Sequence, residues 1–166
     1  EYLPIQVNTP FSVGNTGYNL NNNCLIQEAD IIHLHWVCEM LSIHNIKQLL
    51  ALNKPIIWTC HDSWPFTGGC HVRYGCMNFT QTCGKCEELE VNNRYDITYK
   101  IMRKKLKEWD SNKIVFIAPS NWMKDNIHQS ALFQKNRVEV IPNTLDTEIF
   151  NPRRLKTKEF RDKINI

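Results

Sequence analysis

Residues 43–60 decide the fold, and they read IHNIKQLLALNKPIIWTC. Apolar residues recur at helical spacing over residues 43–52, which predicts a short amphipathic helix. Asn53-Lys54-Pro55 ends that helix, because proline cannot continue it. Residues 56–60 are apolar and begin with β-branched side chains, so they predict a buried strand. A helix that runs directly into a buried strand is typical of α/β proteins.

The same alternation continues on both sides of this stretch. Further strands are predicted over residues 31–36, 113–118 and 137–141. An amphipathic helix is predicted over residues 94–109, with Lys105 and its other basic side chains mostly away from the apolar face. Another helix begins after Ser120, its expected N-cap. This order predicts a parallel sheet covered by helices.

The composition is that of an ordinary globular protein, with 42% apolar and 22% charged residues among 166. The net charge of +3 is small and dispersed, so we expect no nucleic-acid partner. No stretch is apolar for long enough to cross a bilayer. Residues 1–150 are interpreted as one domain, and the polar residues 151–166 as the start of a linker.

Ligands of parallel sheets bind outside the carboxyl ends of the strands. Each predicted strand is followed directly by polar or aromatic residues, which makes this edge the candidate site. The residues concerned are Trp36, His61, Asp62, Ser120, Asn121 and Asn143.

Several motifs in this region point to one family. They include ADIIHLHW at residues 29–36, KPIIWTCHDSWPFTGGCH at 54–71, APSNW at 118–122 and VIPNTLDTEIF at 140–150. In this order they resemble the family-4 glycosyltransferases that build bacterial capsular and exopolysaccharides. The resemblance spans residues 29–152 and is specific because the motifs occur together.

The resemblance implies a GT-B enzyme, in which two Rossmann-like domains face a cleft. The chain then corresponds to an incomplete N-terminal, acceptor-side domain: a Rossmann-like parallel sheet with helices on both faces. It implies retaining transfer from a nucleotide-sugar donor, held by a C-terminal domain absent here, to a saccharide or lipid-linked acceptor. No catalytic metal is expected, and this part alone is expected to be inactive.

A cytoplasmic location follows from the same resemblance, at the inner face of the cytoplasmic membrane if the protein is peripheral. The basic helix over residues 94–109 either contacts anionic lipid or simply faces solvent, and the solvated face is favoured.

The resemblance places His61 at the active-site histidine that follows this strand in retaining GT-B enzymes. A neutral imidazole both donates and accepts hydrogen bonds, which suits contact with the donor sugar; a structural histidine is the alternative. Asp62 is a second catalytic candidate, which either orients His61 or caps a turn. His33 and His35 share one side of a strand, and buried, hydrogen-bonded histidines are favoured over a metal site.

Four residues are candidates for substrate binding: Trp36, Ser120, Asn121 and Asn143. Trp36 either stacks on a sugar or belongs to the core. Ser120 and Asn121 open a helix whose N–H groups can receive an anion or a sugar hydroxyl, although N-capping alone explains Ser120. Asn143 contacts donor or, the reading we favour, serves as a hinge.

Cysteines crowd into the long glycine-containing loop over residues 61–93. The candidate metal ligands are Cys70, Cys76, Cys83 and Cys86, with His71 as an alternative. Their C-x-x-C half is typical of structural zinc, whereas the wider spacing of the other half is not. Free thiols or two disulfides are the alternatives, and the cytosolic context implied by the resemblance disfavours disulfides. A non-catalytic, zinc-stapled binding module is therefore the alternative function.

Overall fold

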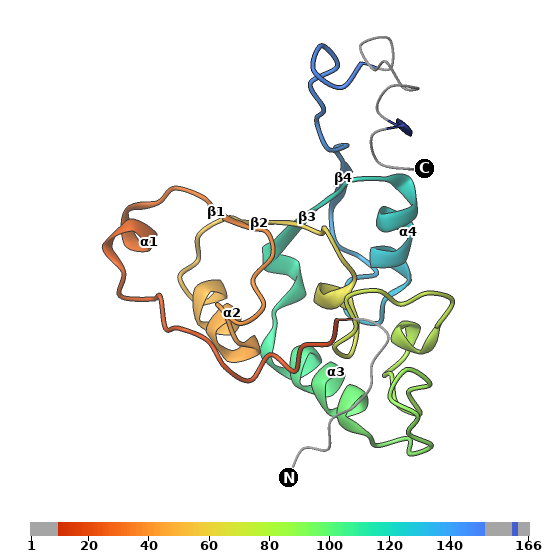
Figure 1. Ribbon diagram of the computed structural model, residues 1–166. Helices are drawn as coiled ribbons and strands as arrows, with labels where there is room; N and C mark the ends of the chain where they lie inside the picture. The colour runs from red at the N-terminus through yellow and green to blue at the C-terminus, as the bar shows by residue number, and fades with distance from the viewer. Residues whose placement is uncertain (1–9, 152–160, 163–166) are drawn as a thin grey trace.

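The computed structural model describes residues 10–151 and 161–162 (Figure 1). The elements are α1 (Cys24–Glu28), β1 (Ile32–Leu34), α2 (Ile43–Leu50), β2 (Ile56–Thr59), α3 (Ile97–Glu108), β3 (Ile114–Ala118), α4 (Asn121–Gln129) and β4 (Val138–Val140). Short 3₁₀ turns add Trp64–Phe66, Asn78–Thr80 and Ser111–Lys113. The predicted order of strands and helices is confirmed.

The four strands form one parallel sheet in the order β1-β2-β3-β4. The order never reverses, and crossovers between parallel strands are right-handed, so α2, α3 and α4 pack on the same face. In Figure 1 α2 and α3 lie below the strands. The Rossmann-like α/β class is confirmed, whereas the expected helices on a second face are not among the described residues.

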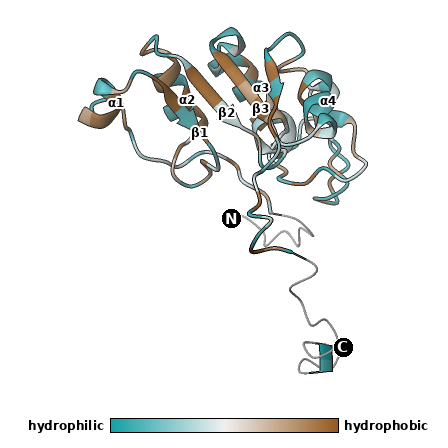
Figure 2. Ribbon diagram, turned by 90° about the horizontal axis from the view of Figure 1, so that it is seen from above, coloured by the Kyte–Doolittle hydropathy of each residue, from teal (hydrophilic) through white to brown (hydrophobic). Residues whose placement is uncertain are grey.

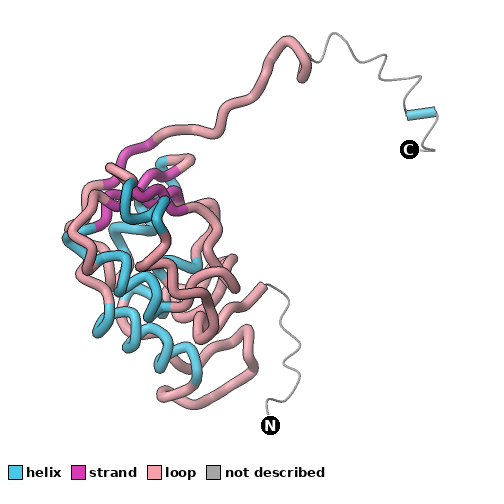
Figure 3. The backbone as a smooth tube through the Cα atoms, turned by 90° about the vertical axis from the view of Figure 1, so that its left-hand side faces the viewer, coloured by secondary structure: helices cyan, strands magenta, loops and turns pink. Residues whose placement is uncertain are grey.

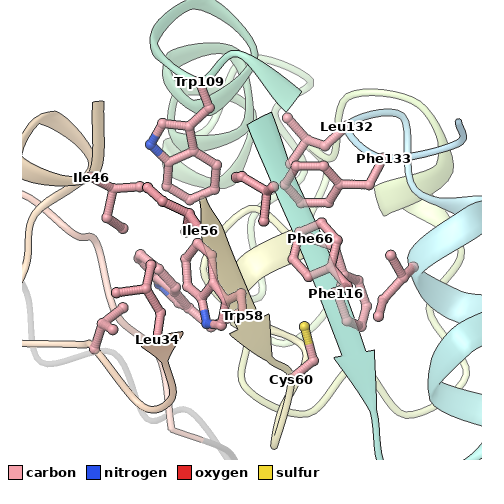
Figure 4. Close-up of a cluster of buried hydrophobic side chains, with 14 of the residues drawn as sticks. Leu34, Ile46, Ile56, Trp58, Cys60, Phe66, Trp109, Phe116, Leu132 and Phe133 are labelled. Carbon is pink, nitrogen blue, oxygen red and sulfur yellow. The ribbon is translucent and has the colours of Figure 1, made fainter. Parts of the chain in front are cut away.

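One face of the sheet carries the core. Trp58 on β2 and Phe116 on β3 are paired in register and stack with ring centroids 6.2 Å apart. Trp109 lies 5.6 Å from Trp58, and Phe133 lies 4.6 Å from Phe116 (Figure 4). Figure 2 shows the apolar character of β1, β2 and β3. Most residues that point the other way are exposed or half-buried, namely His33, Ile57, Val115, Ile117 and Glu139, whereas Thr59 is buried beside His33.

Helix α3 differs from its prediction. It begins later, after the N-cap Asp96, whose side chain accepts a hydrogen bond from Tyr99 N. The side chains it buries are Thr98, Ile101, Met102 and Lys105, while Tyr95 is 59% exposed. The prediction that Lys105 lies away from the apolar face is wrong, because its ammonium finds main-chain acceptors inside the core.

Lys105 fastens α3 to the loop that follows β2. Its Nζ donates to the carbonyl oxygens of Trp64 and, at 3.0 Å, of Thr67. The same atom lies 3.8 Å from the centre of the Trp64 ring and 5.3 Å from that of Trp109. Burial lowers the pKa of Lys105 to about 7, against weaker opposing effects of neighbouring thiols and Asp62.

The long loop is held by further main-chain contacts with the N-terminal segment. Phe11 and Cys70 form an isolated antiparallel bridge, and Ser12 N donates to Gly69 O at 3.0 Å. Gly69 has φ +129°, and a Cβ there would lie 2.5 Å from the Phe11 ring, so only glycine fits. This loop is therefore part of the packed domain.

After β4 the chain leaves the sheet and runs outward (Figures 1 and 3). All of residues 141–150 are exposed. Most of the predicted linker, residues 152–160 and 163–166, lies outside the described residues. None of the helices in the described part of the chain is long and apolar enough to span a membrane.

Candidate functional site

The carboxyl ends of neighbouring strands bring the candidate residues to one edge of the sheet. Trp36 follows β1, His61 follows β2, and Ser120 precedes α4 directly beyond β3. All three are exposed at this edge. Because β1, β2 and β3 are adjacent and parallel, these positions adjoin one another as predicted.

Three histidines form a chain along this edge. His33 Nε2 is 2.9 Å from Thr59 Oγ1, and His35 Nδ1 is 3.0 Å from His61 Nε2. The rings of His33 and His35 lie 4.2 Å apart. All three are exposed, so the expectation that His33 and His35 are buried is wrong: in the part of the chain that the structure describes, no helix covers their side of β1. The pKa of His33 is lowered by partial burial and then by the nearby charges of His35 and His61.

Asp62 is hydrogen-bonded to His71 rather than to His61, its neighbour in the sequence. Its Oδ2 lies 2.7 Å from Nδ1 of His71, and its Oδ1 accepts the main-chain N–H of Trp64 at 2.9 Å. His71 is 2% exposed, and its Nε2 lies 2.8 Å from Ser12 Oγ. Asp62 therefore caps a turn and holds a buried imidazole, and His61 is oriented by His35 instead.

Trp36 is an exposed platform. It is 55% exposed and stacks on His71, with ring centroids 4.6 Å apart and planes inclined by 22°. The alternative that Trp36 belongs to the core is therefore wrong. Its contact with a buried imidazole fixes the indole, while its exposure leaves area for a ligand.

Helix α4 contributes the next part of the edge. Ser120 is its N-cap, as predicted, and its Oγ accepts Met123 N at 3.2 Å. Asn121 is the first residue of the helix and is exposed, as is Asn143 beyond β4. Their roles in binding remain predictions.

Two residues of the edge were not singled out from the sequence. Trp122 is 54% exposed, and the guanidinium of Arg73 lies 5.4 Å from its ring centre. Arg73 also lies 5.1 Å from the ring centre of Phe79 and donates to Asn126. Trp122 belongs to the APSNW motif, so a tryptophan in the first turn of the helix after a strand was the available signal; Arg73 carried none.

The described cysteines are all free thiols. Across residues 10–151 and 161–162, no three His, Cys, Asp or Glu side chains are already placed to hold a metal ion. The zinc assignment for Cys70, Cys76, Cys83 and Cys86 therefore stays a prediction.

The fold and this edge define an α/β protein with a candidate ligand site at the carboxyl ends of its strands, and sequence comparison gives the family. Residues 18–149 match the model of Glycosyltransferase Family 4, so the chain belongs to that family. The match supports the glycosyltransferase interpretation and gives no support to a non-catalytic zinc module.

A curated relative agrees with this assignment. The chain is 27% identical over 126 residues to the "Putative colanic acid biosynthesis glycosyl transferase WcaC" of Escherichia coli (strain K12). The matched region covers 70% of this chain and 30% of the relative, so the chain spans about a third of that protein's length. No solved structure matches the chain.

Proposed function

We propose that the chain is the acceptor-side part of an enzyme that transfers a sugar from a nucleotide sugar to a saccharide or lipid-linked acceptor in polysaccharide biosynthesis. Family membership and the name of the Escherichia coli relative support this function. The observation that carries it is His61, exposed directly after β2 and held by His35. The donor-binding domain would follow this one in the full-length protein.

His61 is the proposed active-site residue. Its Nε2 is hydrogen-bonded to His35, which orients the ring and leaves Nδ1 on the side away from this bond. An imidazole in this position can hydrogen-bond a hydroxyl of the transferred sugar and fix its orientation. Asp62 has an indirect role. It does not hold His61 but holds His71, the imidazole on which Trp36 stacks.

The remaining edge residues are proposed to bind the acceptor. Trp36 offers an apolar face to a sugar ring, while Ser120 and Asn121 offer polar groups at the start of α4. Asn143 is proposed as the hinge between the domains. Retention of configuration and stabilisation of the leaving diphosphate by the second domain complete the proposal.

The location follows from the proposed acceptor. The enzyme works in the cytoplasm, with peripheral contact to the membrane where a lipid-linked acceptor resides. The exposed basic side chains of α3 (Lys100, Arg103 and Lys107) suit such a contact.

The test is His61→Ala in the full-length protein, after a screen of UDP-, GDP- and TDP-sugars identifies the donor. Turnover should fall about 100-fold or more, with unchanged thermal unfolding. His44→Ala is the matched control, because His44 is exposed on α2 and pairs with Glu108 at 3.2 Å, away from the edge. Wild-type turnover in His61→Ala would refute the assignment of His61. Absence of turnover by the wild type with every donor would count against the function itself.

A further inference from the structure

The loop between β2 and α3 contains a cavity that the proposed reaction does not use. Its volume is ≈ 290 Å³. Three thiols line it, those of Cys70, Cys76 and Cys86, and the carboxylates of Glu87 and Glu88 lie beside them. A cavity lined by several thiols and carboxylates has the donor atoms of a divalent-metal site.

The thiols of this loop form a single cluster. Cys70 is hydrogen-bonded to Cys86 and lies close enough to Cys76 and Cys83 to interact with both electrostatically. Cys83 interacts in turn with Cys76 and Cys86. All four cysteines named from their spacing therefore lie in one part of the loop, although they are separated by up to sixteen positions, from 70 to 86.

Main-chain groups already lie close to three of the sulfur atoms. Cys76 Sγ accepts the N–H of Asn78 at 3.5 Å. The main chain of Glu88 and Leu89 lies close to the Cys86 sulfur, and that of Gly68 lies close to the Cys83 sulfur. Such outer contacts orient the ligands of metal sites.

A second observation at the same cavity points to a cation as ligand. Oε2 of Glu88 is buried and has no hydrogen-bond partner among residues 10–151 and 161–162. Buried carboxylate oxygens are costly without a donor or a cation. This orphaned oxygen lies in a residue that lines the cavity of the three thiols.

The backbone of the loop also adopts uncommon conformations. Four non-glycine residues of the loop have positive φ: Tyr74 (45°), Cys83 (56°), Lys85 (50°) and Glu90 (51°). Between Phe66 and Ile97 a single 3₁₀ turn, Asn78–Thr80, is the regular structure of the described chain. Such a conformation persists when something outside local structure holds it.

We propose that Cys70, Cys76 and Cys86 bind one zinc ion, with Cys83 or Glu88 as the fourth ligand. Thiolates select zinc over the harder divalent ions. The side chains do not yet converge on one point, so binding requires them to turn toward the cavity, and metal binding is coupled to closure of the loop. Cys70 directly precedes His71, so the metal would fix the residue on which Trp36 stacks.

The test measures metal and thiols in the full-length protein, purified without chelator, and needs no activity. We expect about one zinc per chain in the wild type and in the control Cys24→Ser, whose cysteine is exposed in α1 outside the loop. Cys70→Ser, Cys76→Ser and Cys86→Ser should each retain less than about a tenth. Zinc loss from Cys83→Ser or from Glu88→Gln identifies the fourth ligand.

A second measurement covers variants that fail to fold. In the wild type, a thiol reagent should modify the loop cysteines slowly, and a chelator that removes zinc should make them reactive. Less than about a tenth of an equivalent of zinc after incubation with zinc chloride would overturn the proposal. A Cys70–Cys86 disulfide would also overturn it; peptide mapping would detect this bond as a linked peptide pair two hydrogens lighter than the two reduced peptides together. Because neither readout involves sugar transfer, failure here leaves the proposed function untouched.

Discussion

Replacing Lys105 with methionine should remove a pH dependence of stability that the wild type shows above neutral pH. The Lys105 side chain is 0% exposed and donates to the carbonyl oxygens of Trp64 and Thr67. Methionine is similar in length and apolar, so it fills the same space without a charge or a donor. Lys100→Met, an exposed lysine of the same helix, is the matched control.

The magnitude follows from the lowered pKa of Lys105. Burial takes that pKa from 10.5 to about 7. Between these values the unfolded chain binds more protons than the folded one, so the free energy of unfolding falls as the pH decreases toward 7 and levels off below it. The difference of 10.5 minus about 7 corresponds to about 5 kcal/mol at most. Two carbonyl oxygens and two indole rings stabilise the ammonium, so the measured change should be smaller.

Urea unfolding at several values between about pH 7 and pH 9 measures this effect. The wild type and Lys100→Met should gain up to about 2–3 kcal/mol across that range relative to Lys105→Met. Other titrating groups are common to all three proteins and cancel in the comparison. Parallel curves for the wild type and Lys105→Met would refute a lowered pKa for this lysine.

Three further substitutions test the packing around the site. Asp62→Ala leaves the buried imidazole of His71 and a main-chain N–H without an acceptor and should cost about 3 kcal/mol in urea unfolding; no loss would mean that the pair contributes nothing. Phe116→Ala opens a cavity in a fully buried position and should cost about 3–5 kcal/mol by the same measurement, whereas a cost below about 1 kcal/mol would contradict the described core. Gly84→Ala should cost more than about 1 kcal/mol in thermal unfolding, because Gly84 has φ +94° and a Cβ would collide with the carbonyl oxygen of Arg94; an unchanged midpoint would exclude that conformation.

Local chemistry along the chain determined the elements and their order. Pro55 cannot continue a helix, and Ser120 caps one, so the boundaries near β2 and α4 were predictable from single residues. Alternating strands and helices require a parallel sheet, which places Trp36, His61 and Ser120 at one edge. The position of the candidate site was thus available from the sequence.

Packing between distant segments decided which side chains are buried and which partners they meet. The sequence predicts a solvated side chain for Lys105. In the structure the loop after β2 places two carbonyl oxygens beside its ammonium, so the side chain is buried. The sequence predicts that His33 and His35 are buried. They are exposed because the sequential strand order places the crossover helices α2, α3 and α4 on the opposite face of the sheet. Asp62 meets His71 and not His61 because the loop folds back over the edge. Periodicity indicates the conformation of one segment. Burial and pairing of side chains depend on which other segments cover them, so only the tertiary structure decided these features.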